Sequence, residues 1–329
     1  MRNVKKNKYT VAVVGCGKVG ALYSAEKGRP ASASHAGAAA SHTKTELVAL
    51  VDTNAKALAR AGKLFPKAMR YASASECIKK EAPDIVVIAT PPSARLPLIK
   101  LCVQNKVRAI ICEKPLANSV REARAIARAV DRGKTVFVLN YQRRFSPLFE
   151  RTRAAIASGA LGRVQQATCY YSNGLYNNGG HALDALLQLL GDGMEVRFAR
   201  VNKNAAHPPG DPCIDAVLET KKGARIVLQS LDQKAYGIFD ILLLCTRGER
   251  ALLDYGSTLV ETRARTSIFE GVRQLDRARA SSRRGDPQGT LAYAVACLER
   301  GTPPSSGVKN GVQVVELLEK IKNYARKNK

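Results

Sequence analysis

A short run near the start of the chain has the residue types and spacing of a loop that binds a dinucleotide: Gly15-Cys16-Gly17-Lys18-Val19-Gly20. It follows an apolar, β-branched run at 9–14 and precedes a stretch that we expect to be helical from Lys18 onward. In such a loop Gly15 permits a tight turn, Gly17 lets the backbone approach a pyrophosphate, and Gly20 lets helix and strand pack closely. Lys18 and Val19, in the first helical turn, would offer free N–H groups and the positive end of the helix dipole to the phosphates. The alternative is an ordinary strand–turn–helix connection.

A carboxylate that follows the next predicted strand supplies the second feature of a dinucleotide site. Asp52 ends the strand at 47–51, where it can accept hydrogen bonds from both ribose hydroxyls of an adenosine and repel a 2′-phosphate. No arginine follows it directly, so the sequence favours NAD over NADP as the cofactor. Asp52 lies 32 positions after Gly20, more than the usual interval of about 20. We attribute the surplus to a loop at 27–32 that breaks the crossover before a second helical piece at 35–41.

Alternating strand-like and helix-like segments position these features. Short apolar strands are predicted in the first 145 residues at 9–14, 47–51, 84–89, 109–112 and 135–139. Between them, one helical stretch opens at Lys18 and others are predicted at 55–63, 98–105 and 120–131. This alternation predicts an α/β Rossmann dinucleotide-binding domain over 1–145, built on a doubly wound parallel sheet.

The pattern changes after about residue 160. Strand-like segments now follow one another at 163–171, 195–203, 214–220, 225–231 and 238–245. Helices are predicted at 181–190, 290–300 and 308–326. Long strands with few crossovers predict a C-terminal α+β domain over 146–329 with a mostly antiparallel, open sheet.

The composition argues against several classes of protein. The net charge is +26, and residues 1–145 carry 27 basic against 9 acidic side chains. The basic residues are spread over predicted helices, so we interpret them as solvated surface; attraction of an anionic substrate is a weaker alternative, and nucleic-acid binding is disfavoured. Eight scattered cysteines without CxxC pairs predict reduced thiols in a cytoplasmic protein, and four distant histidines predict no metal site. We find no apolar run of membrane-spanning length and no signal peptide.

Motifs along nearly the whole chain resemble those of the Gfo/Idh/MocA family of sugar and polyol oxidoreductases. They are GCGKVG at 15–20, ATPP at 89–92, EKP at 113–115, YQRRFSP at 141–147, GALG at 159–162, GGHALDALLQLLGD at 179–192 and SSGVKNG at 305–311. The resemblance implies reversible oxidation of a secondary alcohol of a sugar, cyclitol or sugar derivative, with hydride passing to NAD. It also implies a C-terminal domain that binds substrate and pairs through its open sheet, giving a homodimer or homotetramer.

The resemblance further implies that Glu113 and Lys114 reach the nicotinamide end of the cofactor. A cationic Lys114 there would stabilise a developing alkoxide, and we expect it to be catalytic; a surface lysine is the alternative. The loop Thr90-Pro91-Pro92 would line the cofactor cleft at the same edge of the sheet.

His181 matches the histidine that members of this family use as a general base. It stands at the start of a predicted helix, whose positive end keeps an imidazole neutral and able to accept a proton; a histidine that packs locally is the alternative. The family frequently has aspartate four residues earlier, but this chain has Asn177. Asparagine can hydrogen-bond a substrate hydroxyl but cannot relay a proton.

Tyr141, Arg143 and Arg144 follow the last predicted strand of the first domain, and we expect one of them to face the substrate. An arginine would suit a carboxylate or phosphate, and an ion pair between the domains is the alternative. We expect the active site in the cleft between the domains. The alternative function is an NAD-binding protein without net dehydrogenase activity, either regulatory or similar to the family's NAD-dependent glycosidases.

Overall fold

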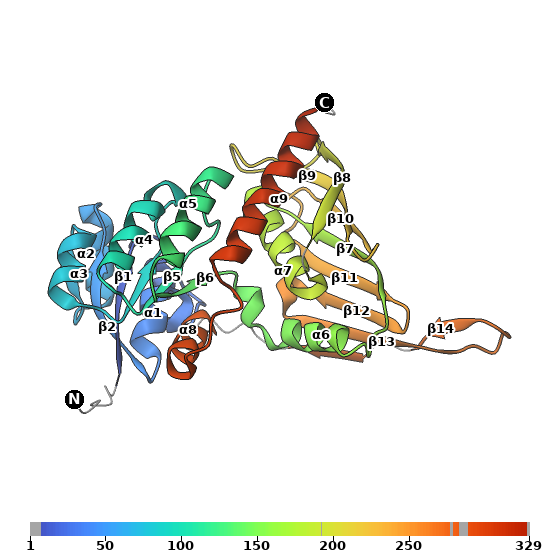
Figure 1. Cartoon of the computed structure of the whole chain (residues 1–329), viewed down its shortest axis with the longest axis horizontal. Helices are drawn as coiled ribbons and strands as arrows, with labels where there is room; N and C mark the ends of the chain where they lie inside the picture. The colour runs from blue at the N-terminus through green and yellow to red at the C-terminus, as the bar shows by residue number, and fades with distance from the viewer. Residues whose placement is uncertain (1–7, 192, 277–278, 283–288, 328–329) are drawn as a thin grey trace. The chain divides into compact units, whose positions relative to one another are not determined.

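A computed structural model describes residues 8–191, 193–276, 279–282 and 289–327 (Figure 1). Backbone contacts divide the chain into two compact units, the first formed by 1–142 and 286–312 and the second by 143–285 and 313–329. The sequence analysis expected one boundary after residue 145. Residues 286–312 belong instead to the first unit because their helix α8 (Gly289–Arg300) packs against strands β5 and β6.

The first unit is built on a six-stranded parallel sheet with strand order β3-β2-β1-β4-β5-β6. The strands are β1 (Tyr9–Val14), β2 (Thr45–Val51), β3 (Met69–Tyr71), β4 (Ile85–Ile88), β5 (Ala109–Cys112) and β6 (Val136–Leu139). Every residue of β4 and β5 is buried, as expected for central strands covered on both faces. The predicted Rossmann topology is therefore confirmed.

The helices of the first unit are α1 (His35–Ser41), α2 (Ala55–Leu64), α3 (Ala74–Glu81), α4 (Arg95–Gln104), α5 (Val120–Asp131) and α8. Four of them, α1, α2, α3 and α5, begin at a side chain that caps the first turn. In α5, for example, the Ser119 hydroxyl accepts the amide of Glu122, and Ala123, Ile126 and Val130 are buried at helical spacing.

The crossover after β1 differs from the sequence-based expectation. The helix predicted to open at Lys18 is only a turn, followed by the short 3₁₀ helices at Leu22–Ala25 and Ala31–Ala33. Gly28, with φ of +83°, and Pro30, which has no N–H, prevent a regular helix in the intervening segment. The amides of His35 and Ala36 then donate to the carbonyls of Val19 and Gly20 at 3.0 and 2.9 Å. Helix α1 thus continues from the turn across an excursion of residues 21–34.

The second unit is built on a mostly antiparallel sheet with strand order β14-β13-β12-β11-β7-β10-β9-β8, and β15 pairs with β13. The strands are β7 (Val164–Tyr171), β8 (Met194–Val201), β9 (Ile214–Thr220), β10 (Arg225–Ser230), β11 (Phe239–Cys245), β12 (Gly248–Leu253), β13 (Thr258–Thr266), β14 (Arg273–Leu275) and β15 (Arg279–Ser282). Strands β7 and β10 run parallel; the other described pairs are antiparallel. The predicted α+β class is confirmed, whereas β12 to β15 were not predicted.

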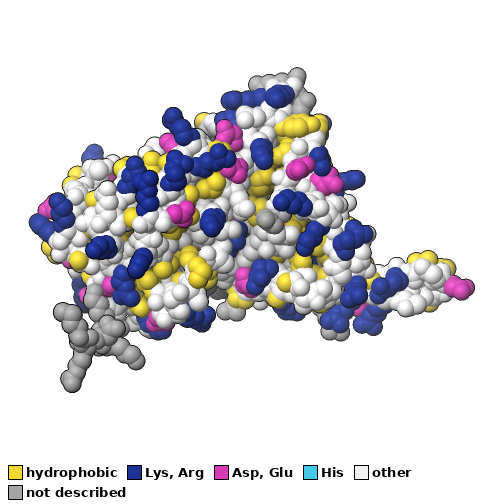
Figure 2. All heavy atoms as spheres, in the orientation of Figure 1, with side chains coloured by type: hydrophobic (Ala, Val, Ile, Leu, Met, Phe, Trp, Pro, Cys, Tyr) yellow, Lys and Arg dark blue, Asp and Glu magenta, His cyan; other side chains and the backbone are white. Residues whose placement is uncertain are grey.

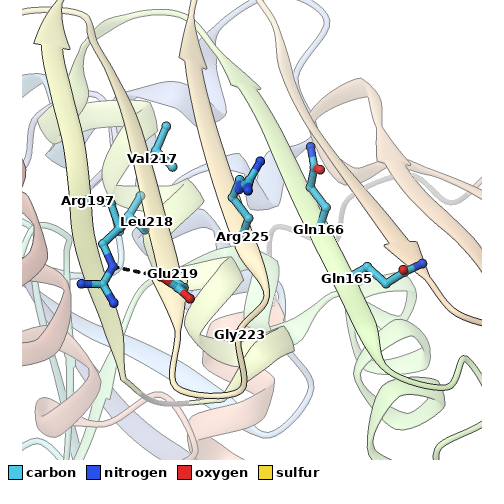
Figure 3. A pocket seen from close by; sticks show the side chains of 8 residues that line it. All are labelled: Gln165, Gln166, Arg197, Val217, Leu218, Glu219, Gly223 and Arg225. Carbon is cyan, nitrogen blue, oxygen red and sulfur yellow. Dashed lines mark hydrogen bonds and ion pairs between the residues drawn. The ribbon is translucent and has the colours of Figure 1, made fainter.

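The two faces of this sheet differ. Helix α7 (Gly180–Leu190) lies against β7 and α6 (Pro147–Ala157) against β12, where they cover inward residues such as Cys169 and Ile241. The last helix, α9 (Val308–Lys327), begins in the first unit and continues in the second. Side chains on the opposite face are half-buried or exposed. A hollow of about 460 Å³ lies over β7 to β10, flanked by Gln166, Arg197 and Arg225 (Figure 3).

Basic and acidic side chains are interspersed on the surface. On the face drawn in Figure 2, lysine and arginine are scattered among acidic side chains. None of the helices in the described part of the chain is long and apolar enough to cross a membrane.

Candidate functional site

The glycine loop after β1 has the geometry that close approach of a pyrophosphate requires. Gly15 has φ of +99°, and a side chain there would meet the carbonyl of Ala89. A Cβ on Gly20 would overlap the carbonyl oxygen of Gly15, so this position must be glycine for the turn to close. A Cβ on Gly17, by contrast, would have no atom within 4 Å and would project into open space. Lys18 and Val19 are exposed beside it.

Asp52 is fixed next to this loop at the end of β2. Its Oδ2 accepts the amide of Cys16 at 2.7 Å, and its Oδ1 accepts the amide of Asn54 at 2.8 Å. A carboxylate offers about four acceptor positions. Two therefore remain for ribose hydroxyls, and the residue is only half-buried. The loop and Asp52 together fit the adenosine and pyrophosphate parts of NAD.

Two further loops leave the same edge of the sheet because β4 and β5 run parallel to β1 and β2. Thr90-Pro91-Pro92 follows β4, and Glu113-Lys114-Pro115 follows β5 with a cis peptide bond before the proline. Lys114 is half-exposed at this edge.

A buried arginine that the sequence analysis did not single out ties these two loops together. Arg95, only 3% exposed, donates to the carbonyl of Thr90 at 2.9 and 3.1 Å. It also donates to the carbonyl oxygens of Glu113 and Pro115, and to that of Lys114 at 3.4 Å. The backbone on both sides of Lys114 is therefore held by one guanidinium.

The carboxylate of Glu113 points into the first unit. Its Oε1 lies 2.8 Å from His35 Nε2 and accepts the Asn140 amide at 2.5 Å, and Thr290 donates to the other end of that amide group. Burial alone would raise the pKa of Glu113, but the hydrogen bonds from His35 and Asn140 and the charges of His35 and Lys114 together hold it below its ordinary value of 4.5. Glu113 thus orients the segment that carries Lys114, and its carboxylate is engaged by protein groups.

His181 is the second residue of α7 in the second unit, and Asn177 lies just before it in a π-helical turn (Gly174–Gly179). Both are half-buried. The carboxylate of Asp211 fixes this turn by accepting the amides of Tyr176 and Asn177 at 2.7 and 2.9 Å. The sequence analysis did not single out Asp211. This carboxylate lies 34 positions beyond Asn177, and no local sequence pattern indicates that the two meet.

Arg144 forms a buried ion pair with Asp184. Its Nε lies 2.8 Å from both carboxylate oxygens, and the two side chains are 4% and 1% exposed. Burial raises the pKa of Asp184 to about 6, although the attraction of Arg144 opposes the rise. The pair lies within the second unit, so Arg144 and Asp184 serve its core.

The other two candidates for substrate contact occupy different surroundings. Tyr141 is 1% exposed, in the interior of the first unit. Arg143 is half-buried in the second unit, with its guanidinium carbon 3.6 Å from the centre of the Phe239 ring. All eight cysteines are buried and free, and no cluster of three potential metal ligands occurs among the residues described.

Residues 9–141 match the model of a family described as an oxidoreductase family with an NAD-binding Rossmann fold, Gfo/Idh/MocA. An inositol 2-dehydrogenase of Rubrobacter xylanophilus is 33% identical over 119 residues, which is 35% of this chain and 33% of that protein. A D-apiose dehydrogenase of Paraburkholderia graminis is 32% identical over 117 residues, 36% of this chain and 31% of that protein. The matches to these and another of the curated relatives span 31% to 49% of the length of those proteins.

Solved structures are similar over nearly the whole chain. The WlbA dehydrogenase of Bordetella pertussis, solved with NADH and UDP-GlcNAcA, has a TM-score of 0.77 and 21% identity, with 98% of each chain covered. Levoglucosan dehydrogenase, solved with NADH and L-sorbose, has a TM-score of 0.81 and 17% identity, again with 98% of each chain covered. At these identities the likeness shows a shared two-part fold.

Proposed function

We propose that this chain, whose residues 9–141 match the Gfo/Idh/MocA oxidoreductase family, is an NAD-dependent dehydrogenase that acts on a secondary alcohol of a sugar or cyclitol, or on the ketone in reverse. The observation that carries the proposal is the shared sheet edge of the first unit. There the glycine loop, Asp52 and Lys114 follow parallel strands of one sheet. A cofactor that lies along this edge would bring its nicotinamide ring to Lys114, in the loop after β5.

The first unit would hold the cofactor through backbone and one carboxylate. The amides around Gly17 would face the pyrophosphate, Asp52 would accept the adenosine ribose hydroxyls, and Thr90 to Pro92 would line the nicotinamide end. The bound nicotinamide supplies a hydride acceptor at its C4 carbon. Asp52 would repel a 2′-phosphate, which favours NAD over NADP.

Lys114 and His181 would handle the charge and the proton of the substrate hydroxyl. An imidazole nitrogen of His181 accepts the proton, and the ammonium of Lys114 stabilises the negative charge that develops on the oxygen. Asn177 would orient the substrate through its amide but cannot relay the proton. The proposal requires both side chains to act on the same hydroxyl group.

The test is a screen for NAD-linked turnover of free sugars, sugar acids, cyclitols and nucleotide sugars, in which the formation of NADH is measured by its absorbance. Lys114→Ala and His181→Ala are each expected to lower kcat by about 10²- to 10⁴-fold while NADH still binds. Lys100→Ala and His207→Ala, matched substitutions at exposed positions, should keep wild-type turnover. Wild-type activity in both site variants, or turnover of no compound by the wild type, would overturn the proposal. A protein that holds NAD without net turnover is not favoured, since the curated relatives are named as dehydrogenases.

We also propose that the second unit pairs with another copy through the outer face of its sheet. Leu244, on this face, is 43% exposed; Val217, which lines the hollow, and its cross-strand neighbour Val227 are half-buried. A dimer or tetramer is expected in sedimentation equilibrium, and Leu244→Asp should weaken it. A wild-type monomer at all concentrations would contradict this assignment.

The eight free thiols suit a reducing compartment, and we propose the cytoplasm.

A further inference from the structure

One buried guanidinium in the second unit lacks the partners that the other buried arginines have. Arg144 is paired with Asp184, Arg250 lies 2.9 Å from Glu261, and Arg95 is surrounded by carbonyl oxygens. Arg143 has no ion pair among the described residues, and its buried Nε has no hydrogen-bond partner there. Taking a cation out of water without a partner is costly, so such a group calls for a compensating anion.

The protein groups around Arg143 do not provide that anion. The face of its guanidinium rests on Phe239, whose ring stacks on Tyr255 at 6.4 Å between centroids. Burial raises the pKa of the Cys169 thiol to about 12, so this neighbour stays neutral. Asp184 is near, but its carboxylate is already held by Arg144.

Arg143 nevertheless keeps its charge. Burial lowers its pKa to about 10, which leaves the guanidinium cationic at neutral pH. Stacking on Phe239 occupies the face of the fork and leaves its N–H edge for a ligand in the plane of the group. Nε is fully buried, but the residue as a whole is only half-buried, so a ligand can reach its terminal nitrogens from solvent.

The position links Arg143 to the proposed base. The carboxylate of Asp184 acts electrostatically on the guanidinium of Arg143. Asp184 lies three residues, about one helical turn, beyond His181 on α7, and residues three apart share a helix face. Phe239 and Cys169 lie on the buried face of the sheet that α7 covers. Arg143 therefore lies near α7, the helix that carries His181, within the second unit.

We propose that Arg143 binds an anionic group of the substrate, a carboxylate or a phosphate, so that the enzyme acts on an acidic sugar derivative in preference to a neutral sugar. A planar fork with two parallel N–H donors matches both anions, and such charge-assisted bonds are among the strongest in proteins. This inference rests on the proposed function for its claim about turnover, whereas its claim about binding can be tested separately.

The kinetic test compares D-glucuronate, D-glucose 6-phosphate and D-glucose as substrates with NAD. The wild type is expected to prefer one of the two charged probes, and the one it prefers identifies the anion. Arg143→Gln should raise KM for that probe by about 10- to 150-fold, the loss expected for hydrogen bonds to a charged group. The same substitution should reduce kcat/KM for D-glucose by a smaller factor, so that the preference for the charged probe is lost. Arg143→Lys, which keeps the charge but not the fork, should fall between the two.

A matched control and a binding measurement complete the test. Arg153 is an exposed arginine on α6 that pairs with Glu150, and Arg153→Gln should change none of these values. Calorimetric titration of the NADH-loaded protein with D-glucuronate and with inorganic phosphate should show binding that Arg143→Gln weakens by a similar factor. Equal losses on D-glucose and on the charged probes, or charged-probe binding that does not depend on Arg143, would overturn the inference. Absence of turnover together with Arg143-dependent binding would overturn the proposed function and retain the anion site.

Discussion

Two alanine substitutions in the glycine loop should separate cofactor binding from folding. A Cβ at Gly17 meets nothing within 4 Å, so Gly17→Ala should fold normally. Its expected effect on the free energy of unfolding is an increase of about 0.4–1 kcal/mol, because alanine restricts the unfolded chain. A Cβ at Gly20 overlaps the Gly15 carbonyl, and relieving such overpacking costs about 1–3 kcal/mol.

Cofactor affinity should respond in a different way. The methyl group of Gly17→Ala would project where the pyrophosphate must approach the backbone. Losing one N–H bond to a charged phosphate costs about 1.5–3 kcal/mol, which corresponds to about a 10- to 150-fold rise in Kd for NADH. Gly17→Ala is thus expected to be stable but weakly binding, and Gly20→Ala to be destabilised.

NADH fluorescence titration and urea unfolding of both variants measure the two effects independently. If Gly17→Ala binds NADH like the wild type, the backbone at Gly17 does not face the pyrophosphate. If it unfolds at a clearly lower urea concentration than the wild type, the space around its Cβ is not open. Either result would refute the reasoning for the loop.

Three further outcomes are expected elsewhere in the molecule. Asp52→Ala should narrow the ratio of Kd values for NADPH and NADH by at least about tenfold, because the repulsion of a 2′-phosphate is lost; an unchanged ratio would refute this. Glu113 has a folded-state pKa below its ordinary 4.5, so its contribution to stability is present above that pH and is lost as the pH falls through the lower folded-state value. In Glu113→Gln, urea titrations should show that this part of the pH dependence of the free energy of unfolding is lost. A pH dependence identical to that of the wild type would argue against the buried hydrogen-bond network of Glu113. Arg144→Met should cost about 3–5 kcal/mol of unfolding free energy at pH 8, and less at pH 5, where Asp184 becomes protonated; an equal cost at both pH values would contradict the ion pair.

Local patterns in the sequence were sufficient for the sheet of the first unit and for the cofactor loop. Short apolar strands between turn residues, and glycines at fixed intervals, reflect backbone constraints that act within a few positions. Asp52 was predictable for the same reason, since it directly follows its strand. The helix expected from Lys18 was wrong: the chain forms only a turn and a short 3₁₀ helix there, and the regular helix of this crossover, α1, begins at His35.

The supports of the site depend on tertiary contacts that no local pattern shows. His35 and Glu113 are 78 positions apart, and Arg95 reaches the Glu113 carbonyl across 18 positions. Strand β12 escaped prediction because it contains the buried Arg250, which reads as a polar residue until its cross-strand partner Glu261 is known. The sequence likewise could not separate the roles of Arg143 and Arg144, because only the structure shows that Asp184 pairs with Arg144.

The return of residues 286–312 to the first unit has a consequence for synthesis of the chain. Strands β5 and β6 are finished by residue 139, but α8, which packs against them, is translated after almost the entire second unit. While the ribosome makes that intervening sequence, the nascent first unit lacks the helix that packs against β5 and β6. Docking of α8 must therefore wait until the second unit has been translated, and a fragment ending at residue 142 is expected to aggregate or to need a chaperone.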